Sequence, residues 1–371
     1  MEFVIPVHSV SRPLRRAVES CIASAPQGLV RALIIAHEIS AASIAPLLDG
    51  LPKDSYRVLE FSDGIPSSAG PANFGFANAD AEYVAKLDSD DFFSGRFSTS
   101  ALERLRKHRW DVEVYPLLGD SGQTILAPLP RLARRRNLRP ERDRLFYRTG
   151  QRAIMSADLL NRAPVLFRPG FRTGEDFALS FWLWSSGASI FFDDFLPAYH
   201  VTDDATDRLT ADTYSWRELL APLFEMVTMP WACERPLAVR RAMVVKSLRV
   251  TIFSPLKRMN SLAQVTPDDR EALKEIAARL RAFAPGSERY LSRSEANGLD
   301  LLGSDDNDVS LALVRRHLND TTLRMTRIAK NPFLTFTPEG PSGRVVDYLL
   351  NRARTRIARI SHRRSSRTIL G

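Results

Sequence analysis

Three carboxylates fall within four residues, at Asp88, Asp90 and Asp91, directly after the apolar run Tyr83–Leu87. Carboxylates this crowded repel each other unless a positive charge neutralises them. Hard oxygen ligands hold divalent cations such as Mg²⁺, which can also bridge to phosphate oxygens. We therefore interpret the segment as a strand that ends in a binding site for a metal ion and a diphosphate. The structural alternative is a solvated acidic turn.

The residues around this turn resemble the nucleotide-sugar core of family 2 glycosyltransferases. Asn73-Phe-Gly75, a small-residue helix, Glu82-Tyr-Val and Leu87-Asp-Ser-Asp-Asp91 follow in that family's order, and Phe3–Val7 is similar to its opening strand. The resemblance covers roughly residues 1–205. Two positions depart from the family's pattern. Ala72 stands where Arg is usual, and His37-Glu38 stands where the second strand normally ends in Asp-Asp-Gly-Ser.

The resemblance implies a GT-A fold and a metal-dependent, inverting transfer of a sugar from a nucleotide-diphosphate sugar, with a UDP-sugar favoured. Asp88 and Asp90 would bind Mn²⁺ or Mg²⁺. His200 is either a third metal ligand or a strand-end histidine that bonds a neighbour. Residues 201–207 are similar to a segment that closes over the donor. The residues expected at the donor nucleotide are Pro6, Val7, His8, His37, Glu38, Asn73, Asp88 and Ser89.

A second pair of carboxylates, Glu175 and Asp176, precedes the apolar segment Phe177–Trp184. Acidic residues in the first turn of a helix are favoured by the helix dipole, so capping is the structural explanation. The resemblance instead implies that Asp176 is the catalytic base, with Glu175 beside it as an acceptor ligand. Such a base takes the proton of the acceptor hydroxyl as its oxygen attacks the anomeric carbon.

The Gln-x-x-Arg-Trp signature of processive synthases does not follow this pair, so we expect transfer of a single sugar. The expected acceptor is a glycan, a lipid-linked glycan or another cell-envelope molecule, as in polysaccharide biosynthesis. Two alternatives stay open. A nucleotidyltransferase also uses paired carboxylates, although no Gly-rich or Lys-bearing phosphate loop is visible. A non-catalytic scaffold would explain Ala72 and His37.

The composition is that of a soluble globular protein, with 44% hydrophobic and 26% charged residues among 371. Cys21 and Cys233 lie far apart and lack zinc-ligand spacing, which fits a reducing cytoplasm. No signal peptide or stretch of membrane-spanning length is visible. We expect a cytoplasmic protein, either free or peripheral at the inner face of the membrane. The oligomeric state is not readable.

The first half of the chain alternates strands and helices, which predicts a mostly parallel α/β sheet that binds ligands at the carboxyl ends of its strands. We predict a GT-A catalytic domain over residues 1–207 and a helical domain over 208–342. Thr266-Pro-Asp-Asp is a helix-start signal in the latter. Within the predicted catalytic domain, the arginine-rich stretch Pro128–Tyr147 is either a solvated loop or a loop that binds anions.

Residues 343–371 form a basic amphipathic tail in which Asp347 is the only acidic residue. Such a helix can lie on an anionic membrane surface. Alternatively, its apolar residues Val345, Leu349 and Leu350 pack on the helical domain. Nucleic-acid binding is disfavoured, because Tyr348 is the only aromatic residue of the tail that could stack on bases.

Overall fold

In a computed structural model, the chain forms two compact units. Unit 1 comprises Met1–Ala127, Arg135–Leu138 and Arg148–Asp212, and unit 2 comprises Pro128–Arg134, Arg139–Tyr147 and Thr213–Gly371. The structure describes residues 1–97, 99–128, 130–131, 134–149, 152–193, 196–203, 214–259, 265–303 and 307–353. Most of the predicted donor-closing segment and tail residues 354–371 therefore lie outside the described residues.

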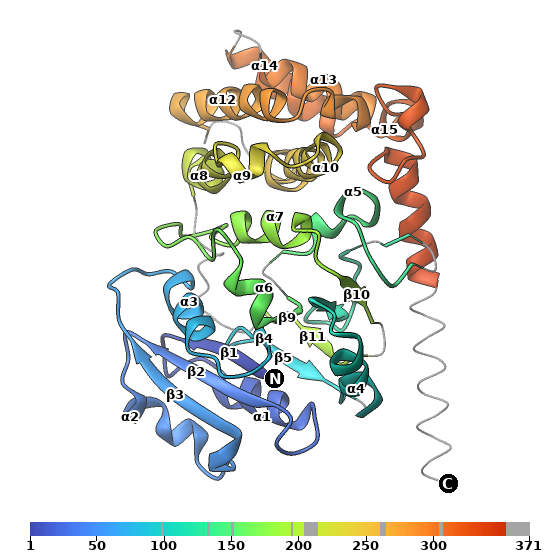
Figure 1. Ribbon diagram of the computed structural model, residues 1–371. Helices are drawn as coiled ribbons and strands as arrows, with labels where there is room; N and C mark the ends of the chain where they lie inside the picture. The colour runs from blue at the N-terminus through green and yellow to red at the C-terminus, as the bar shows by residue number, and fades with distance from the viewer. Residues whose placement is uncertain are drawn as a thin grey trace. The chain divides into compact units, whose positions relative to one another are not determined.

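Unit 1 is built on a seven-stranded sheet of order β10-β6-β9-β4-β1-β2-β3, beside a four-stranded sheet of order β5-β11-β7-β8 (Figure 1). In the larger sheet only β9 runs antiparallel to its neighbours. The strands are β1 (Glu2–Val7), β2 (Arg31–His37), β3 (Tyr56–Phe61), β4 (Tyr83–Lys86), β5 (Phe92–Ser94), β6 (Val112–Val114), β7 (Leu117–Leu118), β8 (Thr124–Ile125), β9 (Ile154–Ser156), β10 (Ile190–Phe192) and β11 (Ala198–His200). The predicted mostly parallel sheet is confirmed.

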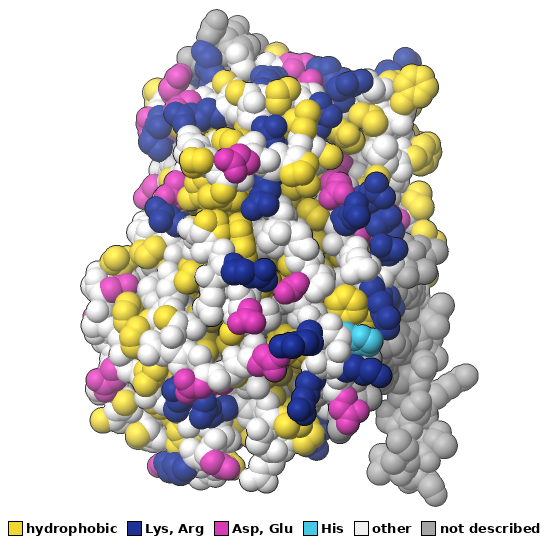
Figure 2. Space-filling view, in the orientation of Figure 1, with side chains coloured by type: hydrophobic (Ala, Val, Ile, Leu, Met, Phe, Trp, Pro, Cys, Tyr) yellow, Lys and Arg dark blue, Asp and Glu magenta, His cyan; other side chains and the backbone are white. Residues whose placement is uncertain are grey.

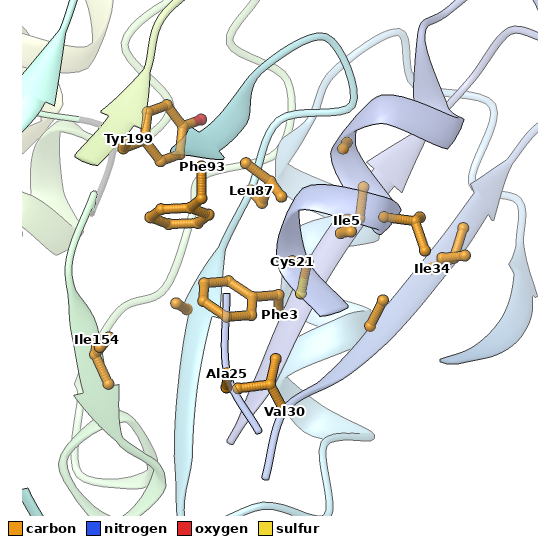
Figure 3. Packing of buried hydrophobic residues seen from close by; sticks show 14 of the residues in the cluster. Phe3, Ile5, Cys21, Ala25, Val30, Ile34, Leu87, Phe93, Ile154 and Tyr199 are labelled. Carbon is orange, nitrogen blue, oxygen red and sulfur yellow. The ribbon is translucent and has the colours of Figure 1, made fainter. Parts of the chain in front are cut away.

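Helices cover both faces of this sheet. The helices of unit 1 are α1 (Leu14–Ala23), α2 (Ala41–Ile44), α3 (Ala69–Ala77), α4 (Thr99–His108), α6 (Ala157–Asn161) and α7 (Phe177–Ser185). Because side chains alternate along a strand, Phe3 and Ile5 of β1 pack in one core with Cys21 of α1 (Figure 3), whereas Val4 faces α3. A Cβ atom at Gly75 would lie 2.3 Å from Val4 Cγ1, so glycine is needed for α3 to approach β1 this closely.

The segment 111–118 forms two strands, β6 and β7. They belong to different sheets, and Tyr115 and Pro116 lie between them. Proline has no N–H to donate to a ladder, so the continuous pairing ends there. The chain then enters the smaller sheet, where β11 pairs parallel to β7 and antiparallel to β5.

Unit 2 is helical in its described part. Its helices are α5 (Pro140–Asp143), α8 (Trp216–Met226), α9 (Pro230–Cys233), α10 (Leu237–Ser247), α11 (Ser254–Arg258), α12 (Pro267–Phe283), α13 (Arg293–Leu302), α14 (Asn307–Leu318), α15 (Leu323–Arg327) and a last helix over 341–353. The predicted start of α12 is confirmed, because Thr266 and Asp269 form a capping box. A six-residue π-helix, Leu248–Phe253, links α10 to α11 and carries the buried Arg249, which pairs with Glu295. Among the described residues, no helix has the length and apolar character needed to cross a bilayer.

Several arginines of the stretch 128–147 have structural partners within unit 2. Arg131 pairs with the fully buried Asp143 at 2.9 Å, and the fully buried Arg144 pairs with Asp347 at 2.7 Å. Arg139 donates its backbone N–H to the same Asp143 carboxylate. These contacts give part of the stretch a structural role, and its anion-binding role stays a prediction.

Candidate active site

A cavity of ≈ 530 Å³ opens in unit 1 where β1, β2 and β4 end. This is the edge at which a parallel sheet binds ligands. All of the predicted site residues line it except Asn73 and His200. The lining residues are Pro6, Val7, His8, Arg12, His37, Glu38, Pro66, Ser67, Ser68, Pro71, Lys86, Asp88, Ser89, Asp90, Thr149, Arg152, Arg172, Thr173, Gly174, Glu175 and Asp176. The structure therefore brings the predicted nucleotide, metal and base residues into one cavity.

Asp88 follows β4 and is held by cations. Lys86 and Arg152 pair with its two carboxylate oxygens, and the Tyr199 hydroxyl donates to one of them at 3.2 Å. Burial would raise the pKa of Asp88, but these cations outweigh burial and hold the pKa well below the ordinary value. Asp88 is therefore ionised across the physiological pH range.

Asp90 is nearly buried and forms an ion pair with Arg12, with 2.8 Å between Oδ2 and Nη1. Its backbone carbonyl accepts hydrogen bonds from Arg16 and from the Thr202 hydroxyl. Arg12 stands just before α1 and also lines the cavity. The carboxylate predicted to bind metal thus has a cationic partner within the protein.

Asp91 serves the structure of the turn. It accepts hydrogen bonds from the Tyr199 hydroxyl at 2.7 Å and from the Thr202 backbone N–H at 2.8 Å. Burial, together with the charge of Asp88, raises the pKa of Asp91 to about 6. These bonds fix β11 and the residues after it against the acidic turn, so they position Asp88 and Asp90.

His37 and Glu38, at the end of β2, form a polar cluster with Asp63. His37 Nε2 lies 2.9 Å from Asp63 Oδ1, and Glu38 accepts the N–H groups of Asp63 and Gly64, both at 2.8 Å. These backbone hydrogen bonds lower the pKa of Glu38. Glu38 adopts φ 58°, a left-handed conformation that costs energy for a residue other than glycine and recurs at functional sites.

The side-chain atoms of His37, Glu38 and Asp63 that could bind a metal all lie within 4.8 Å of one another. Among the described residues, this is the group of three potential metal ligands that lie close enough to share an ion. The predicted set of Asp88, Asp90 and His200 is not gathered in this way. The hydrogen bonds of the His37 cluster account for its closeness without a metal.

Asn73 and His200 lie away from the lining of the cavity. Asn73 exchanges two hydrogen bonds with the backbone of Phe167, at 2.8 and 3.0 Å, and so ties α3 to the loop that leads toward Glu175. His200 stacks on Phe92 at 4.3 Å, and its Nε2 lies 2.6 Å from the Ser94 hydroxyl. This geometry favours the alternative role for His200, a strand-end histidine bonded to a neighbour.

Asp176 occupies the N-cap position of α7, but its side chain makes no capping hydrogen bond. Its carboxylate instead lines the cavity and lies 3.3 Å from the Ser180 hydroxyl. Glu175 accepts a hydrogen bond from Ser68 at 2.9 Å. Burial and the charge of Asp176 raise the pKa of Glu175. Asp176 therefore does not cap α7 through a hydrogen bond, although its charge still lies at the helix N-terminus, where the dipole favours it.

Sequence reasoning missed the cations of the site, Arg12, Lys86, Arg152 and Arg172, and also Asp63. Lys86 gave a usable signal, because a lysine inside a strand that is otherwise apolar must find a partner when buried. Asp63 follows the third strand at the same sheet edge as Glu38. Arg12 and Arg152 have no local signal, because only the tertiary structure brings them to the acidic turn.

No family model and no curated protein matches this sequence. Solved structures do match. One is the crystal structure of S. aureus TarS 1-349 in complex with UDP-GlcNAc, with a TM-score of 0.70 and 13% identity over 85% of this chain and 90% of that one. Another is TarS 1-349 alone, with a TM-score of 0.68 and 13% identity over 89% and 94%. The fold of this chain is of the GT-A type found in glycosyltransferases, as expected from the sequence.

Proposed function

We propose that this protein is a metal-dependent, inverting glycosyltransferase that moves one sugar from a UDP-sugar to a glycan, a lipid-linked glycan or another cell-envelope acceptor. The observation that carries the proposal is that a single cavity on a GT-A sheet is lined by the strand-end residues His37 and Glu38, the acidic turn with Asp88 and Asp90, and Asp176. The similar TarS structures with UDP-GlcNAc and with UDP support a uridine nucleotide as the donor.

In this proposal the donor nucleotide lies over the ends of β1 and β2, among Pro6, Val7, His8, His37 and Glu38. The diphosphate then lies toward the acidic turn, where Arg12, Lys86 and Arg152 offer positive charge. Guanidinium groups suit phosphate oxygens because of their planar, bidentate donors. These residues bind and orient the leaving group.

Asp88 and Asp90 fit a divalent cation by chemistry, because both offer carboxylate oxygens to the cavity, and Asp90 would have to exchange Arg12 for the metal. Mn²⁺ or Mg²⁺ bound there would neutralise charge on the nucleoside diphosphate as it leaves. His200, bonded to Ser94, is left outside the proposed ligand set.

Asp176 is the proposed general base. Its carboxylate takes the proton from the acceptor hydroxyl while that oxygen forms a bond to the anomeric carbon, and the bond from this carbon to the diphosphate oxygen breaks. Attack opposite the leaving group inverts the anomeric centre. In this proposal Glu175, which accepts a hydrogen bond from Ser68, orients the acceptor.

We further propose that the reaction takes place in the cytoplasm or at the inner face of the membrane. Cys21 and Cys233 are both free, which fits a reducing compartment.

The proposal is tested with a panel of nucleotide sugars, with and without Mn²⁺, in assays of thermal shift and of nucleotide release. A glycosyltransferase of this kind should be stabilised by one donor and release its nucleoside diphosphate in an Mn²⁺-dependent manner. A non-catalytic scaffold would be stabilised without release. A nucleotidyltransferase would release pyrophosphate from a nucleoside triphosphate instead.

A further inference from the structure

Unit 2 exposes large apolar side chains close together in the sequence near the end of its described part. Phe333 is 94% exposed, Phe336 77% and Leu323 71%. We call this set the apolar edge, and its members are Leu323, Phe333, Phe336, Val346, Tyr348, Leu349 and Leu350. Figure 2 shows hydrophobic side chains along the right-hand edge of the view, over the segment drawn red in Figure 1. Several large, exposed apolar side chains grouped on one edge of a domain are typical of a binding surface.

The apolar edge stands on a fixed backbone. The N–H groups of Ser342 and Gly343 both donate to the Thr335 carbonyl at 3.1 Å, and the Ser342 hydroxyl donates to the Arg327 carbonyl at 2.7 Å. A Cβ atom at Gly343 would lie 2.2 Å from the Thr337 carbonyl oxygen, so the last helix begins in close contact with the turn that carries Phe336. The exposure of these side chains is therefore built into the packing.

The same part of the chain concentrates the positive charge. Residues 321–371 contain eleven Lys and Arg but only Glu339 and Asp347 as acids, a difference of nine, which equals the formal net charge of +9 of the whole chain. Glu339 is buried, and Asp347 pairs with Arg144, so neither acid offsets the exposed Arg324, Arg327 and Arg352. A surface that combines apolar side chains with excess positive charge fits a partner that is both apolar and anionic.

We propose that the apolar edge of unit 2 is a docking surface for an anionic lipid membrane, with Phe333 and Phe336 as its insertion points. Side chains of this kind enter the boundary between headgroups and acyl chains, while neighbouring arginines bind anionic headgroups. The proposal goes beyond a membrane-binding tail, because it assigns insertion to Phe333 and Phe336, which precede the tail. It is also independent of the proposed transferase activity.

The charge argues against a second copy of the chain, and the aliphatic side chains argue against nucleic acid. A second copy of the chain would bring two surfaces of the same excess charge together, which is unfavourable. Nucleic acid could use the arginines and stack on Phe333, Phe336 and Tyr348, but it would leave the aliphatic Leu323, Val346, Leu349 and Leu350 exposed to water. A bilayer uses both properties of the surface.

The test is co-sedimentation of the full chain with vesicles of phosphatidylglycerol mixed with phosphatidylcholine, compared with vesicles of phosphatidylcholine alone. The test variant is Phe333→Ser/Phe336→Ser, which keeps every charge and the whole tail. The control is Val10→Ser/Leu29→Ser, a double change at half-exposed apolar positions of unit 1. Thermal denaturation of both variants checks that folding is intact.

We expect the wild type and the control to bind the anionic vesicles, less strongly as salt is added. The Phe variant should lose roughly tenfold or more in partitioning per phenylalanine, with its melting temperature unchanged. Equal binding by the Phe variant would assign the contact to the tail and overturn the proposal, as would no vesicle binding by the wild type. If the Phe variant keeps vesicle binding but loses self-association in sedimentation velocity, the surface binds a second copy of the chain. If it keeps vesicle binding but loses binding to a labelled oligonucleotide, the surface binds nucleic acid. Either result would overturn the proposal.

Discussion

Arg12 Nη1 lies 2.8 Å from Asp90 Oδ2, and both side chains are 8% exposed. A guanidinium that pairs with a carboxylate lowers its affinity for a metal ion, because the metal must displace a bound positive charge. Arg12 lines the cavity on the loop after β1. If a metal ion displaced Arg12 from Asp90, the guanidinium would still lie close enough to bind a diphosphate in the cavity. Metal and diphosphate are therefore expected to bind together, with Arg12 passing from one anion to the other.

Arg12→Met should change metal and nucleotide binding in opposite directions. Mn²⁺ alone should bind more tightly because Asp90 is released, whereas UDP in the presence of Mn²⁺ should bind roughly tenfold more weakly because a charged hydrogen bond is lost. Calorimetric titrations measure both affinities. The control is Arg15→Met, an exposed arginine of α1 that pairs with Glu19. A loss of both affinities, or of neither, would show that Arg12 does not exchange partners.

Asp176→Asn should lower turnover by roughly 10²–10⁴-fold, because the amide keeps the shape of the side chain but cannot accept the acceptor's proton. Donor affinity should hardly change, since the base acts on the acceptor. Steady-state kinetics at saturating acceptor, with calorimetry for the donor, separate the two effects. Near-normal turnover would mean that Asp176 only begins α7.

The raised pKa of Glu175 predicts a pH dependence of stability. Because the folded-state pKa lies above the ordinary value of 4.5, the folded chain binds this proton more tightly than the unfolded chain. The free energy of unfolding should then fall as pH rises from about 4.5 through the raised pKa, and Glu175→Gln should lack this fall. Denaturant titrations of both proteins over that pH range check it. Parallel curves for the two proteins would contradict the assignment.

Glu175 should also affect how kcat/KM falls at low pH. Protonation of Glu175 at low pH removes the charge that we propose for orienting the acceptor, so kcat/KM should begin to fall at a higher pH than for an exposed glutamate. In Glu175→Gln the acid limb should move to lower pH, with a lower plateau, because only the general base is then left to be protonated. An unchanged limb would assign it to another group.

The sequence predicted the parts of the site that depend on local patterns. A buried strand that ends in Leu87-Asp-Ser-Asp-Asp91 needs no tertiary information to be located, and parallel strands bring their carboxyl ends to one edge, so His37, Glu38 and Asp88 were expected together. The structure places these three side chains in one cavity.

The partners of these residues could not be predicted in the same way. Arg12 and Arg152 stand 78 and 64 positions from Asp90 and Asp88, and only the packing of α1 and of the loop before β9 brings them there. Which alternative His200 adopts depends on its tertiary contacts with Phe92 and Ser94, which the sequence does not reveal. Packing of the tail's apolar residues was a further alternative, and here Val345 is partly buried, whereas Leu349 is 57% and Leu350 38% exposed.

The central claim is that the acidic turn binds a nucleoside diphosphate through a divalent cation, and calorimetry of UDP binding to the wild type and to Asp90→Asn tests it most directly. Asn keeps the shape of the side chain and removes its charge, and the exposed Asp120→Asn, in the turn between β7 and β8, is the control. We predict that the wild type and the control bind UDP only with Mn²⁺ present, and that Asp90→Asn loses at least about tenfold in affinity, as expected for a lost charged ligand. Equal, Mn²⁺-dependent affinity for UDP in Asp90→Asn and the wild type would contradict the account.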